Sequence, residues 1–318
     1  MKKYKLKKDD KILDIGSNDG TFLNFFSNQD FRVGCDPSSK KFKKYYNKNI
    51  KTIDKIFDDK IRKQLKNKFK FISSIAMFYD LENPIKFCKN IEKILETDGI
   101  FHVEIAYLPD IFKKCSFDTF CQEHLTYFSL ISFKNLIDQT NLKIIDYGRN
   151  DINGGSINFD LAFKKSKLVS KNKKINKLYS SEIKQNFHKV YKYKNFFKDV
   201  NKNIISIKKI IHNLSNKNKK IYGFGASTKG NVSLQLCDLN NKVVKAVYDV
   251  NKEKFNSYTP GTKILIKNEK YIFKDNPDYL ILLIWHFSKT LKKKFNKFKL
   301  KKMKFIWLFP KVKISNKI

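Results

Sequence analysis

The chain has 318 residues, 41% of them apolar, which allows two ordinary domains, each with its own core. No apolar stretch approaches the roughly 18 to 20 residues of a membrane span, and residues 1–10 are mostly charged, so we expect a soluble cytoplasmic protein without a membrane partner. The net charge of +37 comes almost wholly from lysine, with arginine only at positions 32, 62 and 149, and this favours anionic small molecules over nucleic acid as partners.

Short apolar runs alternate with helical patterns in the first hundred residues. The first run ends in a glycine-containing turn, and the second ends at Asp36. Strands are expected at residues 11–15, 31–35, 69–77 and 100–105, and helices at residues 22–26 and 84–95. This alternation predicts an α/β fold, a Rossmann-like domain whose parallel sheet is covered on both faces.

The pattern then changes to a hairpin. Residues 142–147 and 156–163 lie close together across a loop that contains Asn153, Gly154 and Gly155, which favours an antiparallel pair at the edge of the sheet. A seven-stranded sheet with an antiparallel end resembles the class I methyltransferase domain, which we place at residues 1–164.

A helical linker is expected at residues 165–219, because Val200, Ile204, Ile207, Ile211 and Leu214 are spaced as one apolar face of a helix. A second doubly wound α/β domain is expected at residues 220–318. Its first strand enters another glycine-rich turn, and a later strand ends at an acidic residue, Asp249. Its strands are expected at residues 220–224, 243–248, 279–284 and 305–309.

Residues 14–20 read DIGSNDG and predict a cofactor-binding turn. Glycines at 16 and 20 let the backbone turn tightly, and Asp36 follows the second strand, where it can accept hydrogen bonds from a ribose. Dinucleotide enzymes share this layout, but an acidic turn suits a sulfonium and an amino group better than a diphosphate. We therefore expect S-adenosyl-L-methionine as the cofactor. The residues expected to bind it are Asp14, Gly16, Ser17, Asn18, Gly20 and Asp36.

Glu123 and His124 form an acid–base pair within an aromatic segment, residues 117–128, that follows the last parallel strand of the first domain. A histidine titrates near neutral pH and can remove a proton from an activated carbon, while a nearby carboxylate can orient its ring. These residues taken alone leave open whether His124 is a base or a structural histidine.

Several motifs together resemble one family, the sugar C-methyltransferases that act on nucleotide-linked 4-keto-deoxysugars. The motifs are DIGSNDGT at 14–21, FDT at 117–119, EHL at 123–125, YFS at 127–129, GGS at 154–156, GFGASTKGN at 223–231 and YTPGT at 258–262. The resemblance covers nearly the whole chain in one order.

The resemblance implies a mechanism and a substrate. A base removes the proton beside the ketone of a thymidine-diphosphate sugar, and the enolate attacks the methyl group of the sulfonium. His124 matches the family's base, Glu123 matches the acidic residue beside it, and the C-terminal unit helps to bind the nucleotide sugar. Candidate substrate-binding residues in that unit are Gly225, Ser227, Lys229 and Asn231, with His286 from the end of a later strand.

The sequence also departs from the family. Many members have a tyrosine where this chain has Cys121, and a histidine near Tyr79 and Asp80, so we treat Cys121 and Tyr79 as candidate substrate contacts. Members usually carry an N-terminal zinc-binding module, which this sequence lacks. The five cysteines show no metal-ligand spacing, so we expect no metal here unless a separate zinc-binding chain supplies it. Methylation of RNA or another acceptor, and an inactive scaffold, remain the alternatives.

Overall fold

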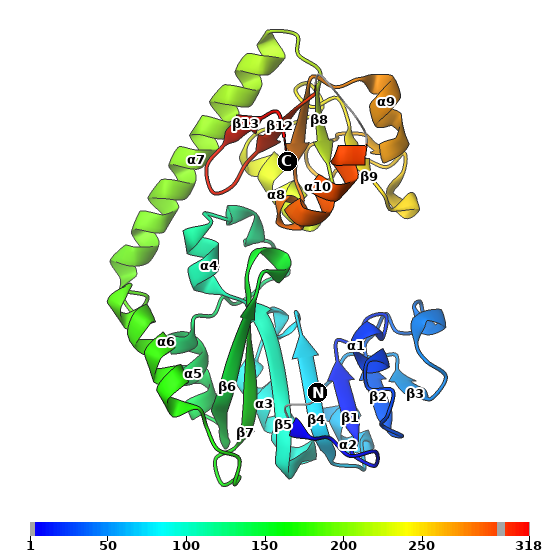
Figure 1. The fold of residues 1–318 in the computed structure, drawn as a ribbon, viewed down its shortest axis with the longest axis vertical. Helices are drawn as coiled ribbons and strands as arrows, with labels where there is room; N and C mark the ends of the chain where they lie inside the picture. Colours follow the sequence, from blue (N-terminus) through cyan, green and yellow to red (C-terminus); the bar gives the residue numbers. More distant parts are fainter. Residues whose placement is uncertain (1–3, 298–302, 318) are drawn as a thin grey trace. The chain divides into compact units, whose positions relative to one another are not determined.

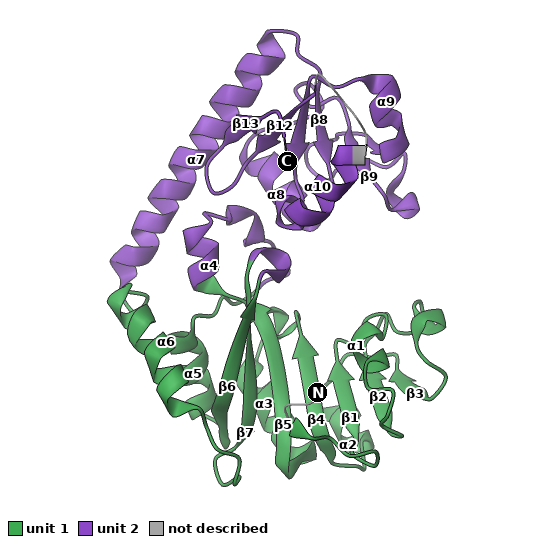
Figure 2. Cartoon of the chain, viewed as in Figure 1, with its two compact units in different colours: residues 1–108, 125–150, 155–188 green, residues 109–124, 151–154, 189–318 purple. Residues whose placement is uncertain are grey.

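The computed structural model describes residues 4–297 and 303–317, and they form two compact units (Figure 2). Unit 1 comprises residues 1–108, 125–150 and 155–188, and unit 2 comprises residues 109–124, 151–154 and 189–318. Each unit is described by itself below.

Unit 1 is built, within the described residues, on a seven-stranded sheet in the order β3-β2-β1-β4-β5-β7-β6 (Figure 1). The neighbouring pairs from β3 to β5 are parallel, and β7 runs antiparallel to both β5 and β6. The predicted antiparallel end of the sheet is therefore confirmed. The strands are β1 (Ile12–Ile15), β2 (Arg32–Cys35), β3 (Ile50–Ile53), β4 (Phe69–Ile75), β5 (Leu95–Ala106), β6 (Leu142–Asn150) and β7 (Ser156–Phe163).

Helices cover both faces of this sheet. Successive residues of β1 lie in two separate buried clusters. Leu13 belongs to the cluster that also contains residues of α3 and α5, and Ile12 belongs to the cluster that contains Leu23 of α1. A strand buried on both faces is expected to be largely apolar, and β1 is apolar except at Asp14. The helices of unit 1 are α1 (Thr21–Asn24), α2 (Asp59–Gln64), α3 (Pro84–Ile94), α5 (Leu130–Asp138) and α6 (Asn172–Lys184), with 3₁₀ turns η2 (Lys43–Tyr45) and η3 (Phe78–Asp80).

The segment expected as a linker is divided between the units. Its first helix, α6, belongs to unit 1, because the fully buried Glu182 carboxylate accepts hydrogen bonds from the Tyr107 hydroxyl (2.6 Å) and from the backbone of Leu130 and Ile131 at the start of α5 (2.8 and 2.9 Å). Its second helix, α7 (Val190–Asn216), belongs to unit 2. Of the predicted apolar stripe, Val200, Ile207 and Ile211 are buried, and Ile204 and Leu214 are partly buried. The division therefore falls between two helices.

Unit 2 contains, within the described residues, a six-stranded sheet in the order β10-β9-β8-β11-β12-β13, parallel except for the last pair. Its strands are β8 (Ile221–Phe224), β9 (Val247–Asp249), β10 (Ile266–Asn268), β11 (Tyr279–Leu282), β12 (Lys304–Trp307) and β13 (Lys313–Ser315). The predicted second α/β domain is confirmed. The strand expected at residues 243–248 is shorter, because residues 243–246 form a turn and a loop before β9.

Unit 2 also takes in two insertions from the first half of the chain, residues 109–124 and 151–154 (Figure 2). Its helices are α4 (Leu108–Lys113), α7, α8 (Thr228–Leu236), α9 (Ile272–Asp275) and α10 (Ser288–Lys297), with 3₁₀ turns η4 (Phe117–Thr119), η5 (Ile152–Gly154), η6 (Lys252–Lys254), η7 (Glu269–Tyr271) and η8 (Trp285–Phe287). None of the helices in the described part of the chain has the length and apolar character that crossing a bilayer would take.

Candidate active site

The turn after β1 has the geometry that its glycines predict. Gly16 and Gly20 both adopt positive φ angles, 78° and 74°. A Cβ on Gly16 would lie 2.8 Å from Met77 Cγ, and one on Gly20 would lie 2.5 Å from the Tyr46 ring. Larger residues are therefore excluded at both positions by strain and by contact.

Asp36 lies beside this turn, as the sequence predicts. Its Oδ2 accepts a hydrogen bond from the Asn18 backbone at 3.0 Å, and its Oδ1 accepts one from the Ser38 backbone at 2.6 Å. Tyr46, which sequence reasoning missed, fixes the turn from the other side: its hydroxyl donates to the Asn18 carbonyl at 2.8 Å and lies 2.8 Å from Ser17 Oγ. The turn and the carboxylate thus form one rigid unit at the carboxyl end of β1 and β2.

Asp14 supplies a buried acid just before the turn. Only 3% of the residue is exposed, and its Oδ1 accepts a hydrogen bond from Ser73 Oγ at 2.7 Å. Burial raises the Asp14 pKa to about 7, the Ser73 bond works against this, and the charge of Asp36 adds to it. A cation bound nearby would stabilise the ionised carboxylate. The turn therefore suits a positively charged ligand with a ribose.

His124 lies in unit 2, at the end of the inserted segment 109–124. Its Nδ1 lies 3.0 Å from the Thr119 carbonyl oxygen. Because a carbonyl only accepts, Nδ1 carries the hydrogen and Nε2 carries the lone pair. Burial lowers the His124 pKa, and the charge of Lys229 lowers it further, against the Thr119 hydrogen bond and the charge of Glu123. The ring is thus a neutral imidazole, ready to accept a proton at Nε2.

The neighbours of His124 are placed differently. Glu123 is exposed, and Cys121 is partly buried. Burial raises the Cys121 pKa, with a contribution from a hydrogen bond to Glu123, so the thiol stays protonated. Tyr79 lies in unit 1, where its ring is buried in the core and its carbonyl accepts from the backbone of Leu125 and Thr126. Roles for Cys121, Glu123 and Tyr79 at the substrate stay predictions.

The glycine-rich turn after β8 starts α8. Gly225 has φ 93°, and a Cβ there would lie 2.5 Å from Ile284 Cγ2. Ser227 caps the helix, since its Oγ accepts from the Gly230 backbone at 3.0 Å. The Lys229 ammonium donates to the Asn153 carbonyl at 2.8 Å, and burial lowers its pKa. A half-buried cation therefore lies at the start of this helix, as the sequence predicts for an anion site.

Two buried polar atoms near this turn have no hydrogen-bond partner among the described residues. They are Asn231 Oδ1 and His286 Nδ1. Burial lowers the His286 pKa to about 4, and the charge of Lys229 adds to this effect. Buried polar groups are normally satisfied, so unsatisfied ones beside a cation indicate a place for a polar ligand.

Sequence reasoning missed one acid in unit 2. Asp118 is fully buried, and its Oδ2 accepts a hydrogen bond from Trp285 Nε1 at 2.8 Å. Burial raises its pKa to about 6, although Lys229 and the Trp285 bond lower it. The FDT motif contains this residue, but nothing in the local pattern shows that it pairs with a tryptophan 167 positions away.

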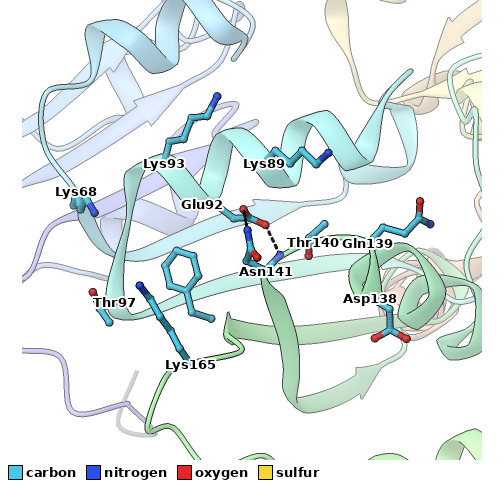
Figure 3. A pocket seen from close by; sticks show the side chains of 11 residues that line it. Lys68, Lys89, Glu92, Lys93, Thr97, Asp138, Gln139, Thr140, Asn141 and Lys165 are labelled. Carbon is cyan, nitrogen blue, oxygen red and sulfur yellow. Dashed lines mark hydrogen bonds between the residues drawn. The ribbon is translucent and has the colours of Figure 1, made fainter.

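A lysine-lined pocket of about 640 Å³ lies elsewhere on unit 1 (Figure 3). Lys68 directly precedes β4 and Lys165 follows β7, so the pocket lies at the amino end of the parallel strands, opposite the cofactor turn. Asn141 bridges to Glu92 there with bonds of 2.7 and 2.9 Å. The lysines of this pocket therefore lie at the opposite edge of the sheet from the cofactor turn.

Two family models match the chain, one for each half. Residues 151–310, half of the chain, match the family described as "C-methyltransferase C-terminal domain", and residues 2–147 match the "Methyltransferase domain". A curated relative, the C-methyltransferase NovU of Streptomyces niveus, is 25% identical over 285 residues, which cover 88% of this chain and 67% of that protein.

Solved structures resemble only about half of the chain. A putative methyltransferase of Bacillus halodurans is 12% identical, with a TM-score of 0.42 over 51% of this chain and 95% of that one. The Haloferax volcanii complex of the Trm112 methyltransferase activator with a putative methyltransferase is 14% identical, with a TM-score of 0.42 over 50% of this chain and 84% of that one. Likeness at this level does not bear on substrate.

Proposed function

We propose that this chain, which belongs to the family described as "C-methyltransferase C-terminal domain", methylates a carbon of a nucleotide-linked 4-keto-deoxysugar. The chain is a C-methyltransferase, and its methyl donor is S-adenosyl-L-methionine. The substrate and the role of His124 are the parts that we propose.

One observation carries the mechanism: the His124 ring has its hydrogen on Nδ1 and its lone pair on Nε2. Its lowered pKa keeps this form populated at neutral pH. We assign to Nε2 the removal of the proton from the carbon beside the ketone, which leaves an enolate. The carbonyl of Thr119 then stabilises the imidazolium through Nδ1, as an acceptor facing a charged donor.

The residues of the β1 turn fit the methyl donor. S-adenosyl-L-methionine, when bound, supplies an electrophilic methyl group on a sulfonium. Asp36 has the position for the ribose hydroxyls, and Gly16 and Gly20 let the backbone make the tight turn beside it. Asp14 provides a buried acid whose ionised form a bound cation would stabilise. An anionic diphosphate would be repelled by the carboxylates of Asp14 and Asp36, so the turn favours a sulfonium ligand over a diphosphate.

The β8 turn supports binding of the nucleotide sugar. Lys229 supplies a cation for a diphosphate, and the positive φ of Gly225 forms the tight turn that leads to the Ser227 cap of α8. Asn231 and His286 supply buried polar atoms for hydrogen bonds to the ligand. All of these residues belong to unit 2, together with His124.

Methylation of RNA is the second candidate, and the net charge of +37 is what supports it. We propose that neither nucleic acid nor a membrane is a partner, and that the enzyme acts in the cytoplasm, where nucleotide sugars are dissolved. The family resemblance adds a separate zinc-binding chain as a proposed partner that completes the substrate site.

Transfer of radiolabel from methyl-labelled S-adenosyl-L-methionine tests the proposal. Thymidine-diphosphate 4-keto-6-deoxysugars and RNA are offered separately as acceptors, to wild type, to His124→Ala and to a matched control, His188→Ala, which changes an exposed histidine in unit 1. We expect label in the sugar, lost by about 10² to 10⁴-fold in His124→Ala and unchanged in the control.

Calorimetry on the same proteins separates binding from chemistry. His124→Ala should bind the methyl donor as tightly as wild type does, because position 124 is not part of the donor turn. Label in RNA alone would contradict the proposed substrate, and full activity of His124→Ala would contradict the proposed base.

A further inference from the structure

The segment that carries His124 belongs to a different unit from its neighbours in sequence. The chain leaves unit 1 after Leu108, forms α4 and η4 in unit 2, and returns to unit 1 at Leu125 (Figure 2). The imidazole is therefore held by the same unit as Lys229, and not by the unit that contains the donor turn.

Two contacts fix η4 within unit 2. The Asp118 carboxylate accepts the indole N–H of Trp285 at 2.8 Å, from the 3₁₀ turn that follows β11. The Phe117 ring packs on Phe309, with centroids 4.8 Å apart, just after β12. Both Phe117 and Asp118 are buried to within 1% of full burial. The segment is thus fastened at two strand ends of the C-terminal sheet.

A short path connects this fastening to the base. Thr119 follows Asp118 directly, is 2% exposed, and its carbonyl oxygen receives the His124 Nδ1–H at 3.0 Å. The same carbonyl also accepts from the Cys121 backbone at 3.0 Å, which shapes the loop up to His124. The position of this one carbonyl therefore sets both the tautomer and the direction of the imidazole.

We propose that Asp118 is a positioning residue for the base: its hydrogen bond with Trp285 holds the Thr119 carbonyl, and through it the His124 ring, on the substrate-binding unit. This inference rests on the proposed function. Precise placement matters because a shift of about 1 Å at a reacting group can cost about a hundredfold in rate. Asp118 itself does not touch the reacting atoms.

Three variants separate the hydrogen bond from other roles of this acid. Asp118→Ala removes the acceptor, Trp285→Phe removes the donor and keeps an aromatic ring, and Asp118→Asn keeps an oxygen that can accept the indole N–H. Asp199→Asn is the matched control, because it changes an exposed carboxylate on α7 in the same unit.

Two rates are measured for each protein: methyl transfer, and uptake of solvent deuterium at the carbon beside the ketone. In the second reaction the C–H bond breaks, the proton passes to His124, and a deuteron returns to the carbon. We expect Asp118→Ala and Trp285→Phe to lower kcat for both reactions by about 10- to 100-fold. Asp118→Asn and the control should stay within about threefold of wild type, because the bond to the indole survives.

The Michaelis constants and the unfolding temperatures make the test specific. The KM for the sugar nucleotide and the Kd of the methyl donor should stay within about twofold in every variant, since a positioning residue acts on kcat. If Asp118→Ala does not fold, Trp285→Phe decides the question. Wild-type rates in Trp285→Phe, or an equal loss of rate in Asp118→Asn and Asp118→Ala, would overturn the inference. If the wild-type protein catalysed neither reaction, the proposed function would be overturned instead.

Discussion

The β1 turn of unit 1 and the β8 turn of unit 2 share one backbone design. In each, the glycine after the strand adopts a positive φ and donates its N–H to the end of the next strand: Gly16 to the Cys35 carbonyl, and Gly225 to the Tyr248 carbonyl, both at 2.8 Å. An acid lies at the end of that second strand in both units: Asp36 directly follows β2, and Asp249 is the last residue of β9.

Each of these acids accepts a backbone N–H from its own turn. The Asn18 N–H donates to Asp36 at 3.0 Å, and the Ala226 N–H donates to Asp249 at 2.7 Å. The backbone alone therefore does not tell the two turns apart.

The charges around the turns are what differ. Asp14 and Asp36 make the first turn acidic, and the second turn contains Lys229 and lies beside Lys254, whose ammonium donates to the Ala226 carbonyl at 2.8 Å and lies 4.0 Å from Asp249. One βα turn can thus be adapted to a cation or to an anion by a few side chains. The function of such a turn has to be inferred from its charges and not from its glycines.

Among variants that compare the two turns, a reciprocal pair of glycine variants should have the largest effects. Gly16→Ala and Gly225→Ala each place a Cβ against a neighbour at a positive φ. We expect Gly16→Ala to weaken binding of the methyl donor by about 10- to 100-fold and to leave binding of the sugar nucleotide unchanged, with the reverse for Gly225→Ala. Calorimetry with each ligand measures both constants. Loss of both ligands in either folded variant would show that the two turns are not independent sites.

Asp36 and Asp249 should also differ in their effect on binding of the methyl donor. Asp36→Asn should weaken methyl-donor binding by about tenfold, because the amide is a poorer acceptor for ribose hydroxyls than the carboxylate. Asp249→Asn should leave that affinity unchanged, since Asp249 is 8% exposed and already accepts from the backbone of Ala226 and Asn251. Titration calorimetry measures both affinities. If both variants bound the methyl donor equally weakly, the proposal that it binds at the β1 turn alone would be wrong.

Because the pKa of Asp14 is raised, we expect the affinity for the methyl donor to depend on pH. Its folded-state pKa of about 7 lies above the usual 3.8, so the folded protein keeps a proton that the unfolded chain loses, and stability from this group falls as pH rises from about 4 to about 7. A bound cation favours the carboxylate, so donor affinity should rise by up to about tenfold between pH 6 and 8. Asp14→Asn keeps an acceptor for Ser73 and should bind the methyl donor with little pH dependence. If this variant showed the same pH dependence as wild type, the assignment to Asp14 would be refuted.

The smallest effect is expected at the lysine-lined pocket of unit 1. Lys89→Ser and Lys93→Ser together remove two of its charges, both from α3 (Figure 3). We expect both ligand affinities and kcat to stay within about twofold of wild type, because exposed charges beyond a Debye length of about 8 to 10 Å are screened. A large loss of activity would instead support a polyanionic acceptor.

The sequence by itself determined both βα turns, the antiparallel hairpin and the acidic character of the cofactor turn. These features depend on residues that are neighbours in the chain: glycine at a strand end, alternating apolar positions, and an acid after the next strand. His124 was also found locally, as an acid–base pair in an aromatic segment.

Only the tertiary structure decided which unit holds His124, the proposed base. Residues 109–124 lie within the first half of the chain, yet they pack with the C-terminal sheet, through contacts such as Asp118 with Trp285 and Phe117 with Phe309. The same is true of Tyr46, which locks the donor turn from 28 residues away. The polar pairs form because buried polar groups need hydrogen-bond partners. The packing of distant segments decides which partners lie within reach, and no local pattern encodes that packing.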